Sequence, residues 1–332
     1  MEFVMQAITI STYGAPEVLT HTELPDPVPA AGEILIAVEA FGLNHAETYM
    51  RAGTWGDVAA VPGIEAAGTV LSDPDGRIPV GAKVIAIMGG MGRTRNGSYA
   101  ELVTVPAENV VAVTTTLDWT ELAAVPEVYA TAWTALTGNL GLRSGDVVLV
   151  RGATSALGQA AVNLAADLGA TVVATTRNPA RTALLTEIGA DHVLIDDGDL
   201  TAAVDTAGLR VDRLLDVVGN SVLRDSLTAV RAGGRVCQIG FLGGLDPVDA
   251  FAPIADLPSA VQLSFFGSFM LGTPEFPLSA IPFDDILAKV AAGTYRARPA
   301  RTFGFGDIVT AHQVMEAGSA GGKMSVRVAQ KS

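Results

Sequence analysis

The chain has 332 residues and a formal net charge of −14, and 49% of its residues are hydrophobic while 17% are charged. This composition is typical of a globular protein of about two domains, and its acidity argues against nucleic acid as a partner because phosphate backbones are also negative. The single cysteine, Cys237, excludes an internal disulfide and any zinc site built from several cysteines. No basic segment precedes a long apolar run and no stretch is apolar enough to span a bilayer, so we expect no signal peptide, no membrane partner and a cytoplasmic location.

The first block, residues 1–125, contains short β-rich runs separated by glycine and proline, which predicts an irregular all-β domain. The runs cover residues 6–11, 33–41, 65–71, 82–88 and 98–106. One helical segment, HAETYMRAG at 45–53, interrupts them.

The second block, residues 126–264, alternates apolar strands with helical stretches, which is typical of βαβ units in a doubly wound parallel sheet. A helix is expected from Gly158 and should end at Gly169. Residues 265–332 form a mixed tail. The strands are expected at 147–152, 171–176, 192–195, 213–218 and 235–240. The predicted fold class is therefore α/β, with a β-rich domain followed by a Rossmann-type domain.

The turn GATSALG at 152–158 joins the first of these strands to a helix rich in small residues. Dinucleotide folds place glycines here for a tight turn, for close approach to the pyrophosphate and for helix packing. Ala153, Ser155 and Gly158 occupy those places, and small side chains still admit a phosphate to backbone N–H groups. The Ser155 hydroxyl could donate a further hydrogen bond, and the helix N-terminus adds partial positive charge. We interpret the turn as a dinucleotide site, with an ordinary βα turn as the alternative.

The choice of cofactor depends on the end of the next strand, where NAD sites carry a carboxylate for the ribose 2′-hydroxyl. Here the chain has Thr175, Thr176 and Arg177, followed by Arg181. Hydroxyls and two guanidinium groups suit a 2′-phosphate, because arginine provides fixed, charged donors. The residues therefore favour NADPH, although both arginines could simply be solvated surface residues.

The order of a β-rich domain, a dinucleotide domain and a returning tail resembles the medium-chain dehydrogenase/reductase superfamily. Within it, the chain resembles the zinc-independent quinone oxidoreductase branch, also called ζ-crystallin-like. The matching pieces are YGAPEVL at 13–19, FGLNHAETYMRAG at 41–53, PGIEAAGTV at 62–70, GSYAELVTVP at 97–106, GATSALG at 152–158, GADHVL at 189–194, GGRVCQIG at 233–240 and GGKM at 321–324.

The resemblance implies a GroES-like domain over residues 1–125 that is completed by residues 265–332, and a Rossmann domain over 126–264. It places the active site in the cleft between them. It also implies a homodimer in which Rossmann sheets join edge to edge, for which the apolar run at 261–271 is the candidate. A buried last strand within one subunit is the equally weighted alternative for this run.

The resemblance further assigns site residues. Asn44 and Tyr49 are the candidate catalytic groups, and Trp55 stands where relatives have a tyrosine, so that it either reshapes the pocket mouth or packs in the core. The implied cofactor contacts are Thr131, Ser155, Ala156, Leu157, Gly158, Thr175, Thr176, Arg177, Arg181, Val218, Gly219, Phe241 and Lys323.

No catalytic metal is expected. The places that hold zinc in metal-dependent relatives correspond to Asn44, Ile64 and about Glu127, and a catalytic zinc needs three nitrogen, sulfur or oxygen ligands. Asparagine is a poor ligand and isoleucine cannot be one. His45 lies near these residues, and we interpret it as a polar residue that opens the helix.

Two functions remain open from the sequence. One is an NADPH-dependent, metal-independent oxidoreductase that transfers hydride to quinones or α,β-unsaturated carbonyl compounds. The other is a structural or sensing protein that binds NADPH with little catalysis, because fold alone does not establish activity. The polar residues Asn44 and Tyr49 favour the enzyme.

Overall fold

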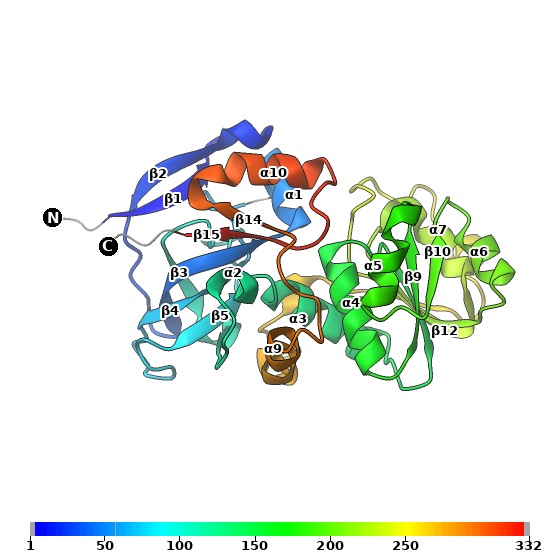
Figure 1. Ribbon diagram of the computed structural model, residues 1–332. Helices are drawn as coiled ribbons and strands as arrows, with labels where there is room; N and C mark the ends of the chain where they lie inside the picture. Colours follow the sequence, from blue (N-terminus) through cyan, green and yellow to red (C-terminus); the bar gives the residue numbers. More distant parts are fainter. Residues whose placement is uncertain (1–3, 57, 329–332) are drawn as a thin grey trace. The chain divides into compact units, whose positions relative to one another are not determined.

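The computed structural model describes residues 4–56 and 58–328, which form two compact units (Figure 1). The first unit runs to Glu127 and resumes at Phe269, and the second unit is Val128–Ser268. The predicted boundaries were placed at 125/126 and 264/265. The C-terminal segment thus belongs with the N-terminal unit, and the predicted fold class is confirmed.

The first unit is built around β3 (Glu33–Leu43), which pairs with three other strands. The larger sheet has the order β14-β15-β3-β4-β5-β7, with β6 also paired to β3. A separate antiparallel pair consists of β1 (Val4–Ile10) and β2 (Leu19–Pro25). The remaining strands are β4 (Glu65–Ser72), β5 (Lys83–Ile87), β6 (Leu102–Pro106), β7 (Val110–Ala112), β14 (Arg301–Gly304) and β15 (Met324–Arg327).

Four α-helices of the described residues lie wholly in the first unit: α1 (His45–Ala52), α2 (Trp119–Leu122), α9 (Phe283–Ala291) and α10 (Ile308–Glu316). Helix α1 contacts α10, as Figure 1 shows. It begins at His45, as predicted, and it ends before Gly53, whose φ of +77° is the left-handed conformation that favours glycine at a helix end. Helix α3 (Pro126–Thr134) crosses the boundary between the units.

The second unit is a six-stranded parallel sheet of order β10-β9-β8-β11-β12-β13. Its strands are β8 (Val147–Arg151), β9 (Thr171–Thr176), β10 (His192–Ile195), β11 (Val211–Asp216), β12 (Val230–Gln238) and β13 (Gln262–Phe265). Helices α4 (Ala156–Asp167), α5 (Thr182–Glu187), α6 (Leu200–Thr206) and α7 (Leu223–Thr228) connect them, and α8 (Pro253–Asp256) precedes β13. In Figure 1, α4 and α5 lie on one side of the sheet, and α6 and α7 lie on the other.

The core of this sheet is a row of apolar side chains in register. Leu149, Val173, Leu214 and Val236 are each fully buried and are paired across neighbouring strands. The continuous apolar runs of the sequence arise here because parallel strands covered by helices on both faces bury both sets of side chains.

Most of the predicted strands differ from the structure by one or more residues at an end, and β11, β12 and β6 show where the differences arise. β11 ends at Asp216 rather than Val218, because the Asp216 carboxylate accepts the N–H groups of Val218 and Gly219 at 2.8 Å and turns the chain. β12 begins earlier, at Val230, and ends at Gln238. β6 begins at Leu102, since the residues before it form only an isolated bridge between Ala100 and Ala7.

Strand β13 is the last strand of its sheet, and its outer edge has no partner strand among the described residues. Leu263 and Phe265 are 37% and 53% exposed, whereas Val261 and Phe266 beside them are buried. The predicted alternative of a buried last strand therefore does not fit, because both apolar side chains of β13, Leu263 and Phe265, are exposed.

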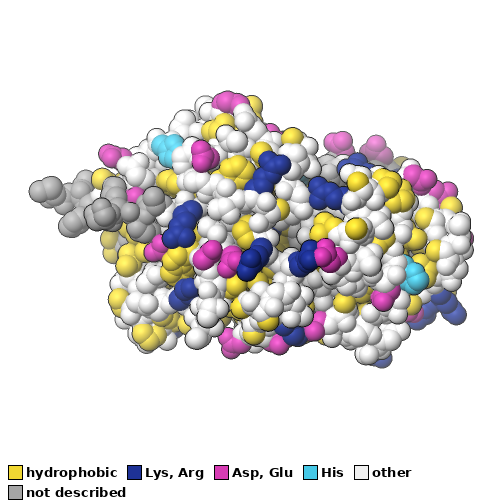
Figure 2. Space-filling view, viewed as in Figure 1, with side chains coloured by type: hydrophobic (Ala, Val, Ile, Leu, Met, Phe, Trp, Pro, Cys, Tyr) yellow, Lys and Arg dark blue, Asp and Glu magenta, His cyan; other side chains and the backbone are white. Residues whose placement is uncertain are grey.

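On the face drawn in Figure 2, lysine and arginine side chains are scattered among acidic and apolar ones rather than gathered into one stripe. In the described part of the chain, none of the helices is long and apolar enough to cross a membrane.

Candidate active site

The turn after β8 in the second unit has the geometry of a phosphate-binding loop. Ser155 is the N-cap of α4, and its hydroxyl accepts the Gly158 N–H at 3.0 Å and donates to the Gly152 carbonyl at 2.8 Å. A Cβ on Gly158 would lie 2.4 Å from that carbonyl oxygen, so only glycine allows the helix to approach the strand this closely. The N–H groups of Ala156 and Leu157 belong to the first turn of α4, where helix geometry provides no intrahelical acceptor. The residues therefore fit a pyrophosphate, with the backbone rather than the serine hydroxyl as donor.

The end of β9 lies beside this loop. The Thr175 hydroxyl accepts the Gly152 N–H at 3.2 Å, and the Thr176 hydroxyl accepts the Asn178 N–H at 3.1 Å, so both threonines shape the turn. Arg177 is exposed and Arg181 is half-buried, on the segment that follows. For Arg177 the structure gives no ion pair with any described residue, which leaves its guanidinium available to a ligand.

The loop after β11 carries two further predicted cofactor contacts, Val218 and Gly219. Both donate their N–H groups to Asp216 Oδ1. Gly219 has a φ of +92°, and a Cβ there would lie 2.4 Å from the Gly240 carbonyl oxygen. Phe241 follows β12, and its ring centroid lies 5.9 Å from that of Phe265. Thr131 is almost fully buried on α3.

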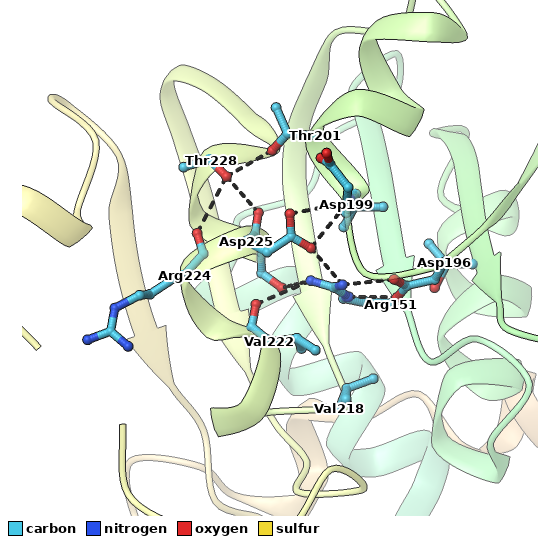
Figure 3. Close-up of polar contacts among 12 residues, drawn as sticks. Arg151, Asp196, Asp199, Thr201, Val218, Val222, Arg224, Asp225 and Thr228 are labelled. Carbon is cyan, nitrogen blue, oxygen red and sulfur yellow. Dashed lines mark hydrogen bonds and ion pairs between the residues drawn. The ribbon is translucent and has the colours of Figure 1, made fainter. Parts of the chain in front are cut away.

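Below the same edge of the sheet lies a buried arginine that the sequence analysis did not single out (Figure 3). Arg151, the last residue of β8, is 0% exposed. Its Nε and Nη2 donate to both oxygens of Asp196 at 2.8 and 2.9 Å, and Nη2 also lies 2.7 Å from Asp225 Oδ2. Its Nη1 donates to the Ser226 hydroxyl at 3.0 Å and to the Val222 carbonyl at 3.2 Å. Each of the three guanidinium nitrogens is thus hydrogen-bonded, and Asp225 adds a second ion pair.

In the first unit, a second cluster gathers around the predicted catalytic Asn44. The Asn44 amide nitrogen donates to Glu65 Oε1 at 2.8 Å, and its oxygen accepts from Lys323 Nζ at 2.6 Å. Lys323 Nζ also donates to Glu65 Oε1 at 2.5 Å. All three side chains are buried, Glu65 fully. The carboxylate fits close to β3 because residue 42 is glycine, where a Cβ would lie 2.3 Å from Glu65 Oε1.

This arrangement does not fit a catalytic zinc. Asn44 has both ends of its amide committed to Glu65 and Lys323, Ile64 has no ligand atom in its side chain, and the Lys323 ammonium brings a positive charge to the same place. The Glu127 N–H donates to Glu65 Oε2 at 2.8 Å. Within the described ranges 4–56 and 58–328, no group of three or more His, Cys, Asp or Glu side chains could hold a metal ion.

A chain of buried titratable groups continues from this cluster. Fully buried Glu47, on α1, accepts the N–H groups of Asn44 and Ile64 and the Tyr99 hydroxyl, the last at 2.8 Å. The Tyr99 oxygen lies 3.0 Å from Nε2 of His312. Desolvation raises the pKa of Glu47 to about 7 and lowers the pKa of His312 to about 3.

Tyr49 and Trp55, the other predicted catalytic residues, lie together. Their rings are stacked with centroids 6.1 Å apart and an interplanar angle of 3°, and His45 contacts Tyr49 edge-on at 5.0 Å. His45 and Tyr49 share one face of α1 because they are four residues apart. Both Tyr49 and Trp55 are half-buried, so neither is a core residue.

The structure therefore joins Asn44 to Lys323, and Tyr49 to Trp55, and it sets Ser155 and Gly158 beside Thr175. The sequence analysis missed Glu65, Glu47, His312 and Arg151. A detectable signal existed for two of them, since Glu65 and Arg151 are charged residues within runs that were predicted to be strands.

Two family models match the chain: an alcohol dehydrogenase GroES-like domain over residues 30–115 and a zinc-binding dehydrogenase domain over residues 156–284. The quinone oxidoreductase of Rattus norvegicus is 30% identical over 277 residues, which are 80% of this chain and 82% of that protein.

Among solved structures, a mycobacterial protein in complex with NADPH superposes with a TM-score of 0.84 at 26% identity, covering 97% of this chain and 99% of that one. An NAD-dependent alcohol dehydrogenase superposes with a TM-score of 0.81 at 25% identity, covering 98% of this chain and all of the other.

Proposed function

This chain belongs to the quinone oxidoreductase branch of the medium-chain dehydrogenase/reductase superfamily and is an oxidoreductase of that family, and from this we propose its reaction. The protein transfers hydride from NADPH to quinones or α,β-unsaturated carbonyl compounds, and it does so without a metal. The observation that carries this proposal is the Asn44 amide, held between Glu65 and Lys323. It provides a fixed hydrogen-bond donor in the place where zinc-dependent relatives hold a metal.

The orientation of that amide follows from charge. An ammonium group only donates and a carboxylate only accepts, so Lys323 must face the Asn44 oxygen and Glu65 must face its nitrogen. The nitrogen has two N–H groups, and one of them suffices for Glu65. The other is available to the oxygen of an acceptor, on which negative charge develops as hydride arrives.

Bound NADPH would supply the hydride. The residues of this chain would contribute the rest: Asn44 donates to the developing oxyanion, and the Tyr49 hydroxyl is the candidate second donor and proton source. Without a Lewis acid, unconjugated ketones should be poor acceptors, because a metal contributes several kcal/mol of charge stabilisation. Conjugated acceptors spread the charge over more atoms and depend less on such help.

NADPH as the cofactor is supported by Arg177 and Arg181 after β9 and by the absence of a carboxylate at that place in the sequence. The loop residues Ser155, Ala156, Leu157 and Gly158 would hold the pyrophosphate. We retain Thr131, Val218, Gly219, Phe241 and Lys323 as proposed cofactor contacts.

The test is steady-state NADPH oxidation with 1,4-benzoquinone, with a saturated ketone for comparison. We expect turnover with the quinone, little with the ketone, and no loss of activity after chelator treatment. NADPH binding without turnover over a panel of quinones, enones and aldehydes would favour the binding-protein alternative. One zinc per subunit in active protein would contradict the metal-free proposal.

We further propose a cytoplasmic homodimer that pairs β13 edges. The support is the unpaired edge of β13 with exposed Leu263 and Phe265, since such an edge is a template for another strand. Sedimentation of the unmodified protein and of a Phe265→Lys variant tests it, and a monomeric unmodified protein would contradict it.

A further inference from the structure

The dinucleotide site of the second unit is divided by the topology of its sheet. The chain proceeds from β8 to β9 and β10 on one side, then returns to β11 and continues to β12 and β13 on the other. The switch point therefore lies between β8 and β11, and a dinucleotide is bound across such a point. The adenosine half belongs beside β9, where the ribose is recognised, so the nicotinamide half belongs on the side of β11.

Arg151 stands at this switch point and reaches to both sides of it (Figure 3). On the β9–β10 side it binds both oxygens of Asp196, which directly follows β10 and whose N–H donates to the Thr176 carbonyl at the end of β9. This contact ties the guanidinium to the strand end that precedes Arg177.

On the other side, the link to the loop after β11 runs through two buried side chains. Arg151 Nη1 donates to the Ser226 hydroxyl, and Ser226 donates to Asp216 Oδ2 at 2.7 Å. Asp216 Oδ1 in turn accepts the N–H groups of Val218 and Gly219. Ser226 and Asp216 are both fully buried, so water does not compete for these hydrogen bonds.

We propose that Arg151 is a positioning residue that fixes the two halves of the dinucleotide site relative to each other, through Asp196 on the adenosine side and through Ser226 and Asp216 on the nicotinamide side. The proposal rests on the proposed nicotinamide cofactor. It concerns binding geometry alone and involves no contact between Arg151 and the cofactor.

Arginine suits this role for a geometric reason. Its planar guanidinium holds five donors in fixed directions, and here they make four hydrogen bonds while Asp225 is held as an ion pair. A lysine would retain the charge, but its three donors could not hold Asp196 by two parallel bonds while also reaching Ser226, Val222 and Asp225.

The test compares the whole cofactor with one of its halves by isothermal titration calorimetry of the full chain. The variant Ser226→Ala cuts only the nicotinamide branch of the network and leaves the ion pairs of Arg151 intact. We expect NADPH affinity to fall about tenfold, as for the loss of one buried hydrogen bond, whereas the affinity for adenosine 2′,5′-bisphosphate stays within about twofold.

Thr228→Ala is the matched control, because it removes a hydroxyl from the same helix, α7, outside the chain of bonds from Arg151 to Gly219. It should leave both affinities unchanged. Arg151→Lys, which also weakens the paired contact with Asp196, should lower NADPH affinity at least as much as Ser226→Ala in a protein that keeps the buried charge.

An equal loss of both affinities in Ser226→Ala would show a general structural role and overturn the proposal, as would unchanged NADPH affinity in that variant. Should the unmodified protein prefer NADH, the same comparison is made with NADH and adenosine diphosphate. Failure of the unmodified protein to bind either cofactor would instead reject the proposed function. A global loss of stability appears as a lower melting temperature, but it does not by itself change the ratio of the two affinities.

Discussion

The two units each bury a cluster of charged side chains, and the clusters differ in how completely their hydrogen bonds are satisfied. Around Arg151 every guanidinium nitrogen has at least one hydrogen-bond partner. In the first unit, Nε and Nη1 of buried Arg51 and Nδ1 of buried His312 have no hydrogen-bond partner within the described part of the chain. The Asn44 amide nitrogen carries two N–H groups, and its hydrogen bond to Glu65 uses one of them.

The difference separates two uses of buried charge. A fully satisfied network makes one geometry much more stable than its neighbours, which suits a scaffold beneath a binding loop. An incompletely satisfied network keeps donors and acceptors that a ligand or a proton can still engage, which suits a reaction site. We therefore expect changes near Arg151 to act on stability and cofactor geometry, and changes near Asn44 to act on turnover and pH dependence.

The largest effect is expected from Arg151→Met, which leaves Asp196 and Asp225 without their counter-ion. Removing one partner of a buried ion pair costs about 3–5 kcal/mol where the remaining charge stays buried, and we expect the lower end of this range because the Asp196 and Asp225 side chains are 11% and 24% exposed. Urea denaturation should show a decrease of this order in the free energy of unfolding of the second unit. The variant Arg151→Met/Asp196→Asn/Asp225→Asn, which removes the charges together, should recover a large part of it. A loss in the triple variant as large as in the single one would show that packing rather than charge is responsible.

The next effect is expected at Asn44, where Asn44→Ala should lower kcat by a factor that corresponds to about 2.7–4 kcal/mol, the range for loss of one oxyanion donor. NADPH affinity should hardly change. Tyr49→Phe should lower kcat in the same way.

Lys323→Met sharpens this prediction, because it removes the group that orients the Asn44 amide. If Lys323 acts through Asn44, its substitution should lower turnover in the unmodified background and add little in Asn44→Ala, which a double-mutant cycle measures. A rise in the dissociation constant of NADPH would support the proposed contact of Lys323 with the cofactor as well. Full turnover in a well-folded Tyr49→Phe/Asn44→Ala variant would reject the site itself.

A smaller effect concerns pH and the chain Glu47–Tyr99–His312. The pKa of Glu47 is raised from 4.5 to about 7, so its contribution to stability is complete below 4.5 and is lost as the pH rises through 7. The pKa of His312 is lowered from 6.5 to about 3, so its contribution is complete above 6.5 and is lost as the pH falls toward 3. As the pH rises from 5 to 6.5, the contribution of Glu47 to stability decreases and that of His312 increases, each by about 2 kcal/mol.

In Glu47→Gln the opposing contribution of Glu47 is absent, so the pH dependence that His312 gives to the free energy of unfolding should become visible. Relative to the unmodified protein, the free energy of unfolding of the variant should fall by about 2 kcal/mol more between pH 6.5 and pH 5. His312→Gln should show the opposite slope over the same range. Lys323, Glu65 and Arg51, the other charges near this chain, remain present in both variants. Parallel stability profiles for all three proteins would contradict the pKa shifts.

The sequence predicted the second unit better than the site in the first. Strand β9 lies where its apolar run was found, because a parallel strand buried on both faces leaves a plain local signal. The edge strand β10 also has its predicted bounds, although its side chains are exposed or half-buried. The C-terminal bound of β11 was misplaced because Asp216 turns the chain with its own side chain, and such a side-chain contact does not appear in a hydrophobic pattern.

The Asn44 cluster could not be predicted from any single segment of the sequence. Its members are separated by up to 279 positions along the chain, so only the pairing of β15 with β3 brings Lys323 to Asn44. Asn44 and Lys323 were proposed separately, from family resemblance and with different roles. Glu65, which joins them, was not proposed.

The smallest effect is expected at the surface of the second unit that we propose faces the cofactor, rather than in the buried network around Arg151. Arg177 and Arg181 lie on the segment after β9, where the former is exposed and the latter half-buried. A charge-assisted hydrogen bond to a phosphate contributes about 1.5–3 kcal/mol, so NADPH should bind at least about tenfold more tightly than NADH. Replacing both arginines by alanine should abolish that preference by weakening the binding of NADPH alone, because NADH has no 2′-phosphate for the arginines to bind.

The preference for NADPH should also shrink as salt is added, since these side chains are reached by solvent. Fluorescence titrations of both cofactors at two ionic strengths measure it, and equal affinity for NADPH and NADH in the unmodified protein would contradict it. A loss of NADH affinity in the same variant would mean that the arginines hold the segment after β9 in place, as Arg151 does from below, rather than recognise the phosphate.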